Sequence, residues 1–246
     1  MKIETLQNIV LLICILLFSS CTPDDPPVPD NPLNRLTTAQ FNPDKNYGTV
    51  TDIDGNVYKT IKIGDQVWMA ENLRVTRYRN GDSIFNVLDN EIWSTAAEGA
   101  YCNYNNTLNM DTIATYGRLY NWYAAADQRN IAPKGWRVPD IDDWSLLIEY
   151  LGGDSIVGVK LKESGDLHWE SPNFADNSSG FTAIPSGFRY RNNKNFQGAG
   201  LFNSYWAMPI YDLGTAPFLS LFSWNSIFHR GINYNVNGYS IRCIRD

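Results

Sequence analysis

The sequence predicts an α+β domain, and three observations lead to this prediction. The chain has 246 residues, of which 13% are aromatic and only 19% charged, a composition that excludes wholesale disorder and a coiled coil. Residues 141–151 have the pattern of a capped amphipathic helix, and a second short helix is expected at 155–162. The second half instead contains brief apolar stretches separated by Asn, Ser and Gly, which are typical of strands. These stretches are residues 181–184, 187–190, 205–208, 218–222, 227–230 and 239–244.

The charge balance narrows the classes of partner. The formal net charge of −6 argues against a protein that binds the phosphate backbone of nucleic acid. Only two histidines, His168 and His229, are present, so a histidine-rich metal site has little support.

The first 40 residues predict export and a lipid anchor. An apolar run from Ile9 to Phe18 is too short to cross a bilayer and is typical of a signal peptide, here residues 1–20. The ending Leu17–Cys21 resembles a bacterial lipobox, so we expect lipidation at Cys21; the alternative is plain secretion with Cys21 unmodified. Residues 21–40 form a Pro- and Asp-rich linker, with five prolines between positions 22 and 32.

These features imply an outer membrane lipoprotein whose partner is the membrane itself. Asp24 and Asp25 resemble the acidic signals that send some Bacteroidetes lipoproteins to the cell surface. We therefore expect a surface-exposed protein, with a periplasm-facing one as the alternative.

From residue 41 the pattern is that of one folded unit. Residues 49–63 alternate apolar and polar on both sides of Asp54-Gly55, which predicts a hairpin, and 66–69 reads as a further strand. Apolar residues at helical spacing predict a short helix over 118–127. The helix at 141–151 has Asp140 as its expected N-cap and ends at Gly152-Gly153. Its residues Trp144 and Leu147 are expected in the core.

Several motifs in order resemble a known family. They are Ile63–Leu73, Tyr116–Ala124, Pro133–Pro139 with Trp144, Gly180–Arg189 and Tyr239–Asp246. Together they are similar to the Fibrobacter succinogenes major paralogous domain, over residues 47–246. The resemblance implies a C-type-lectin-like domain, residues 41–246, with two main helices, small mixed sheets and a long loop-rich region. It implies no particular biochemical activity.

The resemblance also bears on the cysteines. Members of the family often carry a cysteine just before the Pro-x-Gly-Trp segment, where this chain has Ile131-Ala132. Cys243 therefore lacks that partner, and Cys102 is the remaining candidate for a disulfide in an oxidising compartment. The alternative is two separately buried thiols.

Calcium and other cofactors have little support. Asp52, Asp54 and Asn56 resemble the opening of a calcium loop, but the twelfth position is Ile63 instead of Glu, so a hairpin turn is the better interpretation. The segments 171–173 and 224–226 each lack a carboxylate that the calcium site of sugar-binding lectins would require. We expect no cofactor and no metal.

No catalytic residues are predicted. The lone Cys243 does not reproduce the paired-cysteine site of the formylglycine-generating enzymes, which share the lectin-like fold. A glycosidase-type pair remains open among four acidic residues close in sequence, and His168 beside Trp169 is a further candidate; solvated loop residues are the alternative. The four are Glu163, Asp166, Glu170 and Asp176.

Aromatic residues in the second half suggest binding. Aromatic faces beside amide groups suit sugar rings and peptide surfaces. The candidates are Trp206, Tyr211, Trp224 and Tyr234. We therefore expect a lipid-anchored, non-enzymatic binding or adhesion module for a glycan or surface protein. The alternatives are a carbohydrate-active or protein-modifying enzyme, and a structural subunit of a surface assembly.

Three short motifs of Asp, then Ser or Thr, then an aliphatic residue resemble the Bacteroidetes O-glycosylation signal. They would place glycans on Ser83, Thr112 or Ser155, with Thr112 or Ser83 the expected acceptors. Ordinary turns and helix caps are the alternative.

Overall fold

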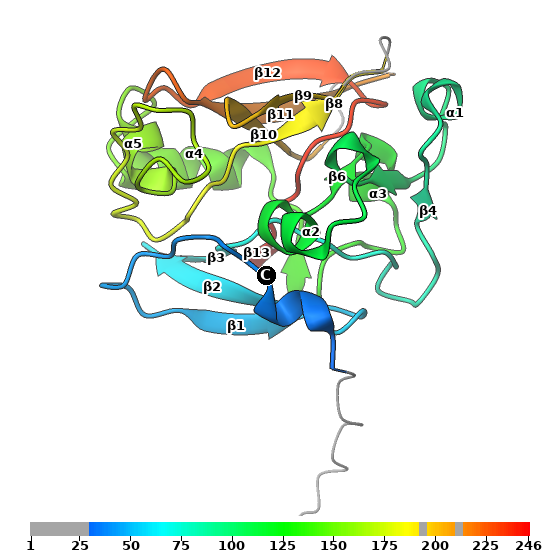
Figure 1. Ribbon diagram of the computed structural model, residues 1–246, viewed down its shortest axis with the longest axis horizontal. Helices are drawn as coiled ribbons and strands as arrows, with labels where there is room; N and C mark the ends of the chain where they lie inside the picture. Colours follow the sequence, from blue (N-terminus) through cyan, green and yellow to red (C-terminus); the bar gives the residue numbers. More distant parts are fainter. Residues whose placement is uncertain (1–29, 192–195, 210–213) are drawn as a thin grey trace, which may run out of the picture.

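Three β-sheets and five α-helices make up the part of the chain that the structure describes. The computed structural model describes residues 30–191, 196–209 and 214–246 (Figure 1). Few helices beside several sheets make this an α+β domain, so the predicted class is confirmed. The helices are α1 (Asn90–Ser94), α2 (Met110–Tyr116), α3 (Trp122–Ala126), α4 (Ile141–Tyr150) and α5 (Val157–Leu161), with 3-10 turns η1 (Pro32–Arg35) and η2 (Tyr104–Asn106).

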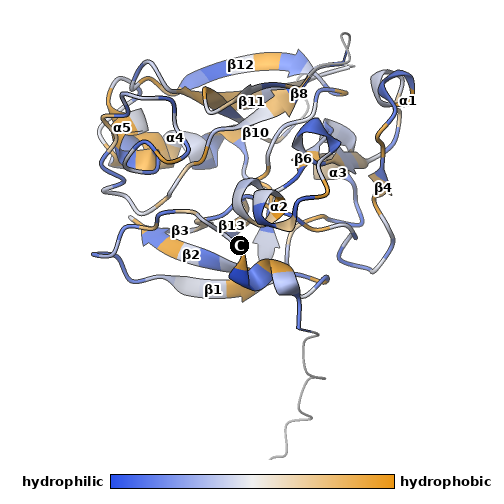
Figure 2. Cartoon of the chain, viewed as in Figure 1, coloured by the Kyte–Doolittle hydropathy of each residue, from blue (hydrophilic) through white to orange (hydrophobic). Residues whose placement is uncertain are grey.

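The first sheet gathers strands from both ends of the chain, in the order β1-β2-β3-β13-β7. Its strands are β1 (Gly48–Thr51), β2 (Val57–Ile63), β3 (Gln66–Met69), β13 (Ile244–Arg245) and β7 (Trp136–Arg137), all antiparallel to their neighbours. Hydrophobic and hydrophilic residues alternate along β2 (Figure 2). This alternation buries Ile61 and Ile63 and exposes Lys62. The predicted hairpin and the strand over 66–69 are therefore confirmed.

The second sheet lies on the other side of the domain and has the order β12-β11-β10-β8-β9 (Figure 1). Its strands are β12 (His229–Tyr234), β11 (Thr215–Phe222), β10 (Phe202–Trp206), β8 (Ser186–Arg189) and β9 (Phe196–Ala199). A small third sheet has the order β4 (Phe85–Asn86), β5 (Ala100–Cys102) and β6 (Leu119–Tyr120). The expected strand over 181–184 is wrong: these residues are irregular, and Ala183 makes only an isolated bridge with Lys162.

Helix α4 forms where the sequence predicts it. Asp140 accepts a hydrogen bond from the Asp143 amide, and Asp143 accepts one from the Asp140 amide, which makes a reciprocal N-terminal cap. The helix expected over 118–127 is shorter than predicted. Residues 119–120 belong to β6, and α3 begins only after Asn121, whose side chain accepts from the Ala124 amide.

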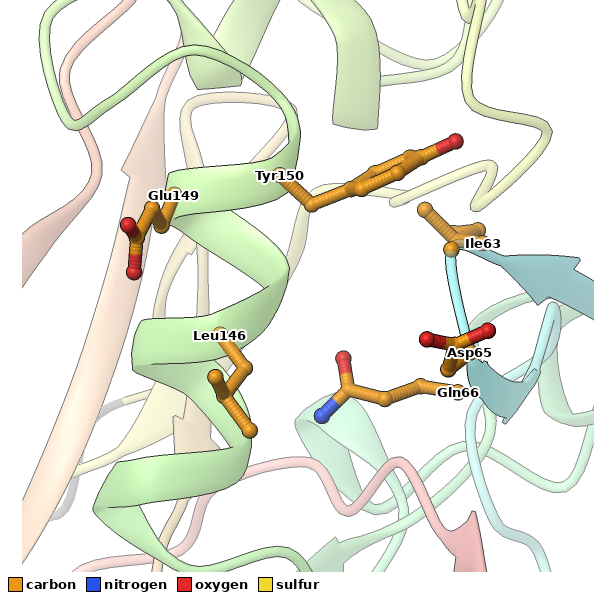
Figure 3. A pocket seen from close by; sticks show the side chains of 7 residues that line it. Ile63, Asp65, Gln66, Leu146, Glu149 and Tyr150 are labelled. Carbon is orange, nitrogen blue, oxygen red and sulfur yellow. The ribbon is translucent and has the colours of Figure 1, made fainter.

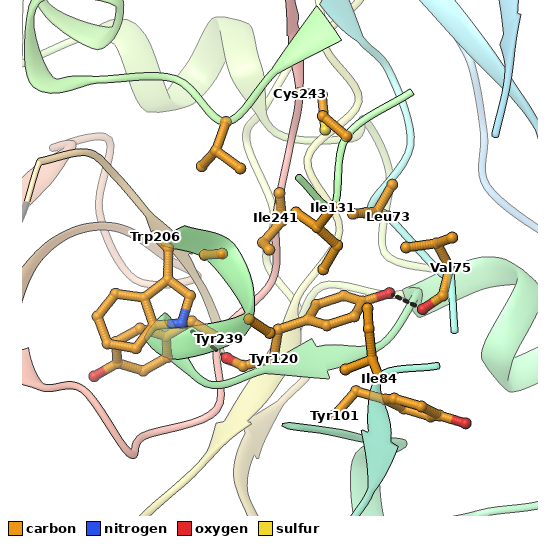
Figure 4. Close-up of a cluster of buried hydrophobic side chains, with 14 of the residues drawn as sticks. Leu73, Val75, Ile84, Tyr101, Tyr120, Ile131, Trp206, Tyr239, Ile241 and Cys243 are labelled. Carbon is orange, nitrogen blue, oxygen red and sulfur yellow. Dashed lines mark hydrogen bonds between the residues drawn. The ribbon is translucent and has the colours of Figure 1, made fainter. Parts of the chain in front are cut away.

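Two large hydrophobic clusters form the core. In the first, Trp206 and Tyr239 pack with rings 4.4 Å apart, and the buried Tyr120 hydroxyl donates to the Val75 carbonyl over 2.7 Å (Figure 4). The second surrounds Trp144, which contacts Trp68 and Phe228 and is fully buried, as is Leu147. Both residues are in the core, as the helix pattern predicts.

The described chain starts beside the first sheet, where η1 contacts α2 (Figure 1). Within residues 30–191, 196–209 and 214–246, no helix has both the length and the apolar character that crossing a membrane requires.

Candidate ligand-binding pocket

An aromatic pocket of about 500 Å³ lies where α5 meets the loop between β11 and β12. Two of its lining residues, Trp224 and Phe174, expose 63% and 82% of their surface. They come from two separate segments, and the Trp224 ring is backed by the Phe222 ring 4.7 Å away. The residues that line this aromatic pocket are Val159, Lys162, Pro172, Phe174, Ala175, Ser223, Trp224, Asn225 and Ser226.

The loop that carries Trp224 is held to helix α5 by its backbone. The Gly158 amide donates to the Ser226 carbonyl over 2.8 Å, and a Cβ on Gly158 would lie only 2.5 Å from that oxygen. The Ser226 hydroxyl donates to the Ser155 carbonyl, and the buried Phe228 ring packs on Trp144. The loop is therefore fixed before any ligand binds, which lowers the ordering cost of binding.

Lys162 holds the same loop from inside. Its ammonium donates to the carbonyls of Phe222, Ser223 and Asn225 over 3.0, 3.4 and 3.1 Å. The residue is 3% exposed, and burial lowers the pKa of its amine to about 8. All three ammonium protons have acceptors. Lys162 therefore stabilises the loop at the pocket and has no hydrogen-bond donor left for a ligand.

The opposite wall is tied together by side chains. Asp166 accepts from the Asn173 amide and from the Ser171 hydroxyl, and the Asn173 carboxamide donates to the Glu163 and Gly165 carbonyls. These bonds position Pro172 and Phe174 at the pocket. Sequence reasoning missed Phe174 and Lys162, because nothing in the sequence pattern reveals which aromatic ring is left exposed.

The four predicted aromatic candidates do not form one site. Trp224 lines the pocket, but Trp206 is fully buried and its indole N–H donates to the Tyr120 carbonyl, so its prediction as a ligand contact is wrong. Tyr234 is 44% exposed, and the Arg191 guanidinium lies over its ring. Strand β12 begins at His229, near the loop that carries Trp224, and Tyr234 lies five residues further on, at the other end of the strand. Tyr211 lies outside the described residues.

The acidic residues considered for catalysis are engaged locally. Buried Glu163 accepts a hydrogen bond from His168 Nδ1 over 2.6 Å. The other ring nitrogen, His168 Nε2, lies 2.9 Å from the Thr38 hydroxyl, so this histidine holds the N-terminal segment against the domain. Asp166 ties its own loop, and Asp176 accepts from the Ser178 amide. Neither these three nor the exposed Glu170 lines the aromatic pocket.

The calcium-like segment forms a turn. Asp52 accepts from the amides of Asp54 and Asn56, from the Asn56 carboxamide and from the Tyr58 hydroxyl over 2.6–2.9 Å. Its oxygens are thus bound within the protein, and burial raises the pKa of the Asp52 carboxyl. Among the described residues, no group of three or more His, Cys, Asp or Glu side chains could hold a metal ion.

Cys102 and Cys243 are free thiols in separate hydrophobic clusters. The predicted disulfide is therefore not formed, and the alternative of two buried thiols holds. Burial raises the pKa of Cys102 to about 12 and that of Cys243 still further, so neither is a reactive nucleophile. Cys21 lies outside the described residues.

The three candidate glycosylation sites differ in exposure. Ser83 and Ser155 are exposed, whereas Thr112 is half-buried and its hydroxyl donates to Asn109, the N-cap of α2. Ser155 precedes the N-cap of α5, which is Ile156. Glycosylation itself stays a prediction, and Ser83 and Ser155 are the exposed acceptors.

A second cavity, of about 420 Å³, lies between α4 and the turn from β2 to β3 (Figure 3). The exposed Tyr150 and Leu146 of α4 face this turn, and Tyr150 packs on Gly64, which has a φ of +60°. The Gln66 carboxamide is already bound to the Asp143 carbonyl and the Trp68 indole. This cavity thus offers one exposed aromatic ring, where the aromatic pocket offers two.

Fold and pocket together define an α+β domain with an aromatic pocket. Residues 61–245 match the model of the Fibrobacter succinogenes major domain, so the chain belongs to this family. No curated protein and no solved structure matches the chain.

Proposed function

We propose that this protein is a lipid-anchored binding module of the outer membrane, with a C-type-lectin-like fold, that recognises neutral glycans at the aromatic pocket. The observation that carries the proposal is the pair of exposed rings, Trp224 and Phe174, in one pocket whose loop is already fixed.

The chemistry of the pocket suits a sugar ring. Aromatic faces pack against the C–H faces of sugars, and the polar side chains at this pocket, Asn225, Ser223 and Ser226, are uncharged. Among the residues that the structure describes, no carboxylate lines this pocket, and the Lys162 ammonium donates to backbone carbonyls. A neutral glycan therefore fits better than an ionic one, and we propose binding without catalysis and without a cofactor.

The expected lipid at Cys21 and the residues between it and residue 30 supply the anchor, since Asn31, Thr38 and Gln40 are already bonded to the domain. The described chain begins beside the first sheet (Figure 1). The aromatic pocket borders the second sheet, because its lining residues 223–226 directly follow β11. This arrangement supports a module that presents its pocket away from the membrane, at the cell surface or, alternatively, into the periplasm.

A glycan array probed with the purified chain tests the proposal. Calorimetry then measures the affinity of the best neutral oligosaccharide for the wild type, Trp224→Ala and Phe174→Ala, and each substitution is expected to weaken binding at least tenfold. Tyr234→Ala is the matched control, because Tyr234 is an exposed aromatic residue far from the pocket. Absence of binding on the array, or unchanged affinity in Trp224→Ala, rejects the proposal. A loss in Tyr150→Ala instead would move the site to the cavity of Figure 3.

A further inference from the structure

A polar pocket of about 380 Å³ lies where the N-terminal segment meets the first sheet. Three guanidinium groups and one carboxylate line it, in a chain whose formal net charge is −6. The residues that line this polar pocket are Asn31, Leu33, Asp54, Asn56, Arg74, Thr76, Arg77 and Arg118.

Arg118 brings a charge that no carboxylate neutralises. Its Nε donates to the Arg74 carbonyl over 2.8 Å, one terminal nitrogen donates to Asn103, and the guanidinium lies over the Tyr101 ring. Across the described ranges it forms no ion pair, and its second terminal nitrogen is not used in any hydrogen bond to the protein. The group is thus fixed in place with donor capacity left over.

Arg74 is almost completely buried, at 1% exposure, and is also incompletely satisfied. Its terminal nitrogens bond to Glu71, Asn34 and the Val57 carbonyl, but its Nε–H has no partner among the described residues. A buried charged group that lacks one hydrogen bond is costly, and Arg74 is one of the residues that line this pocket.

Arg77 and Asp54 form an ion pair in the polar pocket. The Arg77 Nε donates to Asp54 over 2.6 Å, and the second Asp54 oxygen accepts from the amide and hydroxyl of Thr76. Asp54 and Glu71 therefore each pair with one guanidinium group, and Arg118 is the one of the three without a carboxylate partner among the described residues.

We propose that this polar pocket binds an oxyanion of the phosphate or sulfate class, with Arg118 and the buried Arg74 as its donors. Guanidinium groups match the oxygens of such anions in charge and geometry. The site is separate from the aromatic pocket and does not depend on it.

The position of the polar pocket suggests two sources for the anion. Asn31 lies ten positions after Cys21, and ten residues of fully extended chain span at most about 35 Å. If Cys21 carries a lipid, the pocket is within reach of phosphate headgroups; a soluble phosphate or sulfate is the other source.

The test titrates the full chain with sodium phosphate and sodium sulfate at constant ionic strength. Calorimetry gives the dissociation constant, and nitrogen-15 NMR follows the arginine Nε–H signals. We expect the Arg74 and Arg118 signals to shift, and Arg118→Gln to weaken binding at least tenfold. Arg118→Lys, which keeps the charge, is expected to retain part of the affinity. Arg35→Gln is the matched control, because Arg35 is an exposed arginine of the N-terminal segment and does not line the pocket.

Vesicles distinguish the sources. The vesicles are added to the Cys21→Ala chain, which lacks the expected lipid of its own. Phosphatidylglycerol vesicles that bind this chain but not its Arg118→Gln variant, with zwitterionic phosphatidylcholine vesicles as the blank, identify an anionic headgroup phosphate and support the site. Binding of free anions alone supports it with a soluble ligand. The inference is overturned if neither free anions nor vesicles bind, or if Arg118→Gln, shown to be folded by its thermal melt, binds as well as the wild type.

Discussion

Trp144 joins the longest helix to the second core cluster. It is fully buried, and its ring contacts the rings of Trp68, Tyr205 and Phe228 at 4.6–5.5 Å. Replacing it with Ala leaves a large cavity, so we expect Trp144→Ala to lower the free energy of unfolding by about 3–5 kcal/mol. Urea denaturation measures this, with Leu146→Ala as the control because Leu146 is an exposed residue of the same helix. An unchanged midpoint in Trp144→Ala would contradict its place in the core.

Lys162 makes stability depend on pH. Its pKa falls from an ordinary value of 10.5 to about 8 on folding, because the ammonium is buried. Between pH 8 and 10.5 the unfolded chain therefore holds a proton that the folded chain has lost, and this residue's contribution to stability rises with pH. Below pH 8 both states are protonated and the contribution is constant.

The variant Lys162→Met removes this dependence. We expect the stability difference between wild type and Lys162→Met to change in favour of the wild type as pH rises from 8 to 10.5, measured by urea denaturation at several pH values. Lys62→Met on β2 is the control, since Lys62 is exposed. If the free energies of unfolding of the wild type and Lys162→Met differ by the same amount from pH 8 to 10.5, the pKa of Lys162 is not lowered.

At the scale of secondary-structure elements, α5 and the β11–β12 loop act as one unit. Gly158 brings the helix backbone within hydrogen-bond distance of Ser226, and an added Cβ would clash with the Ser226 carbonyl. We expect Gly158→Ala to displace the loop, change the emission of Trp224 and weaken glycan binding, with the fold retained as judged by circular dichroism. Unaltered fluorescence and affinity would mean that the loop is held without this contact.

Elements with local signals could be predicted from the sequence, and those fixed by distant contacts could not. Helix α4 carries its own cap and apolar face, and the hairpin of β1 and β2 carries its own turn. By contrast, residues 181–184 look like a strand but have no strand to pair with. The sequence around Trp206 suggests a ligand contact, yet Trp206 is fully buried, because it lies on β10, the central strand of the second sheet. Exposure of Phe174 likewise depends on how separate segments meet.

At the scale of the whole molecule, the residues that match the family, 61–245, cover most of the α+β fold. The segment before it is held to the domain. Thr38 bonds to Thr115 and His168, and the Gln40 amide donates to Glu163. A tether attached to residue 30 would therefore hold the domain through a fixed point beside the first sheet, with the aromatic pocket bordering the other sheet.

Lipidation at Cys21 is the prediction on which this arrangement rests. The apolar run Ile9–Phe18 followed by Ser-Ser-Cys predicts cleavage before Cys21 and a lipid on its thiol. We expect Cys21→Ala to move the protein from the membrane fraction to the soluble fraction, because alanine has no thiol to accept the lipid. Cys102→Ala, which changes a buried thiol inside the domain, is the control and should remain with the membranes. Intact mass spectrometry of the wild type should show an acylated chain that begins at Cys21. A Cys21→Ala variant that stays membrane-bound at unchanged mass would place the anchor elsewhere, and the proposed orientation of the pocket would then lose its basis.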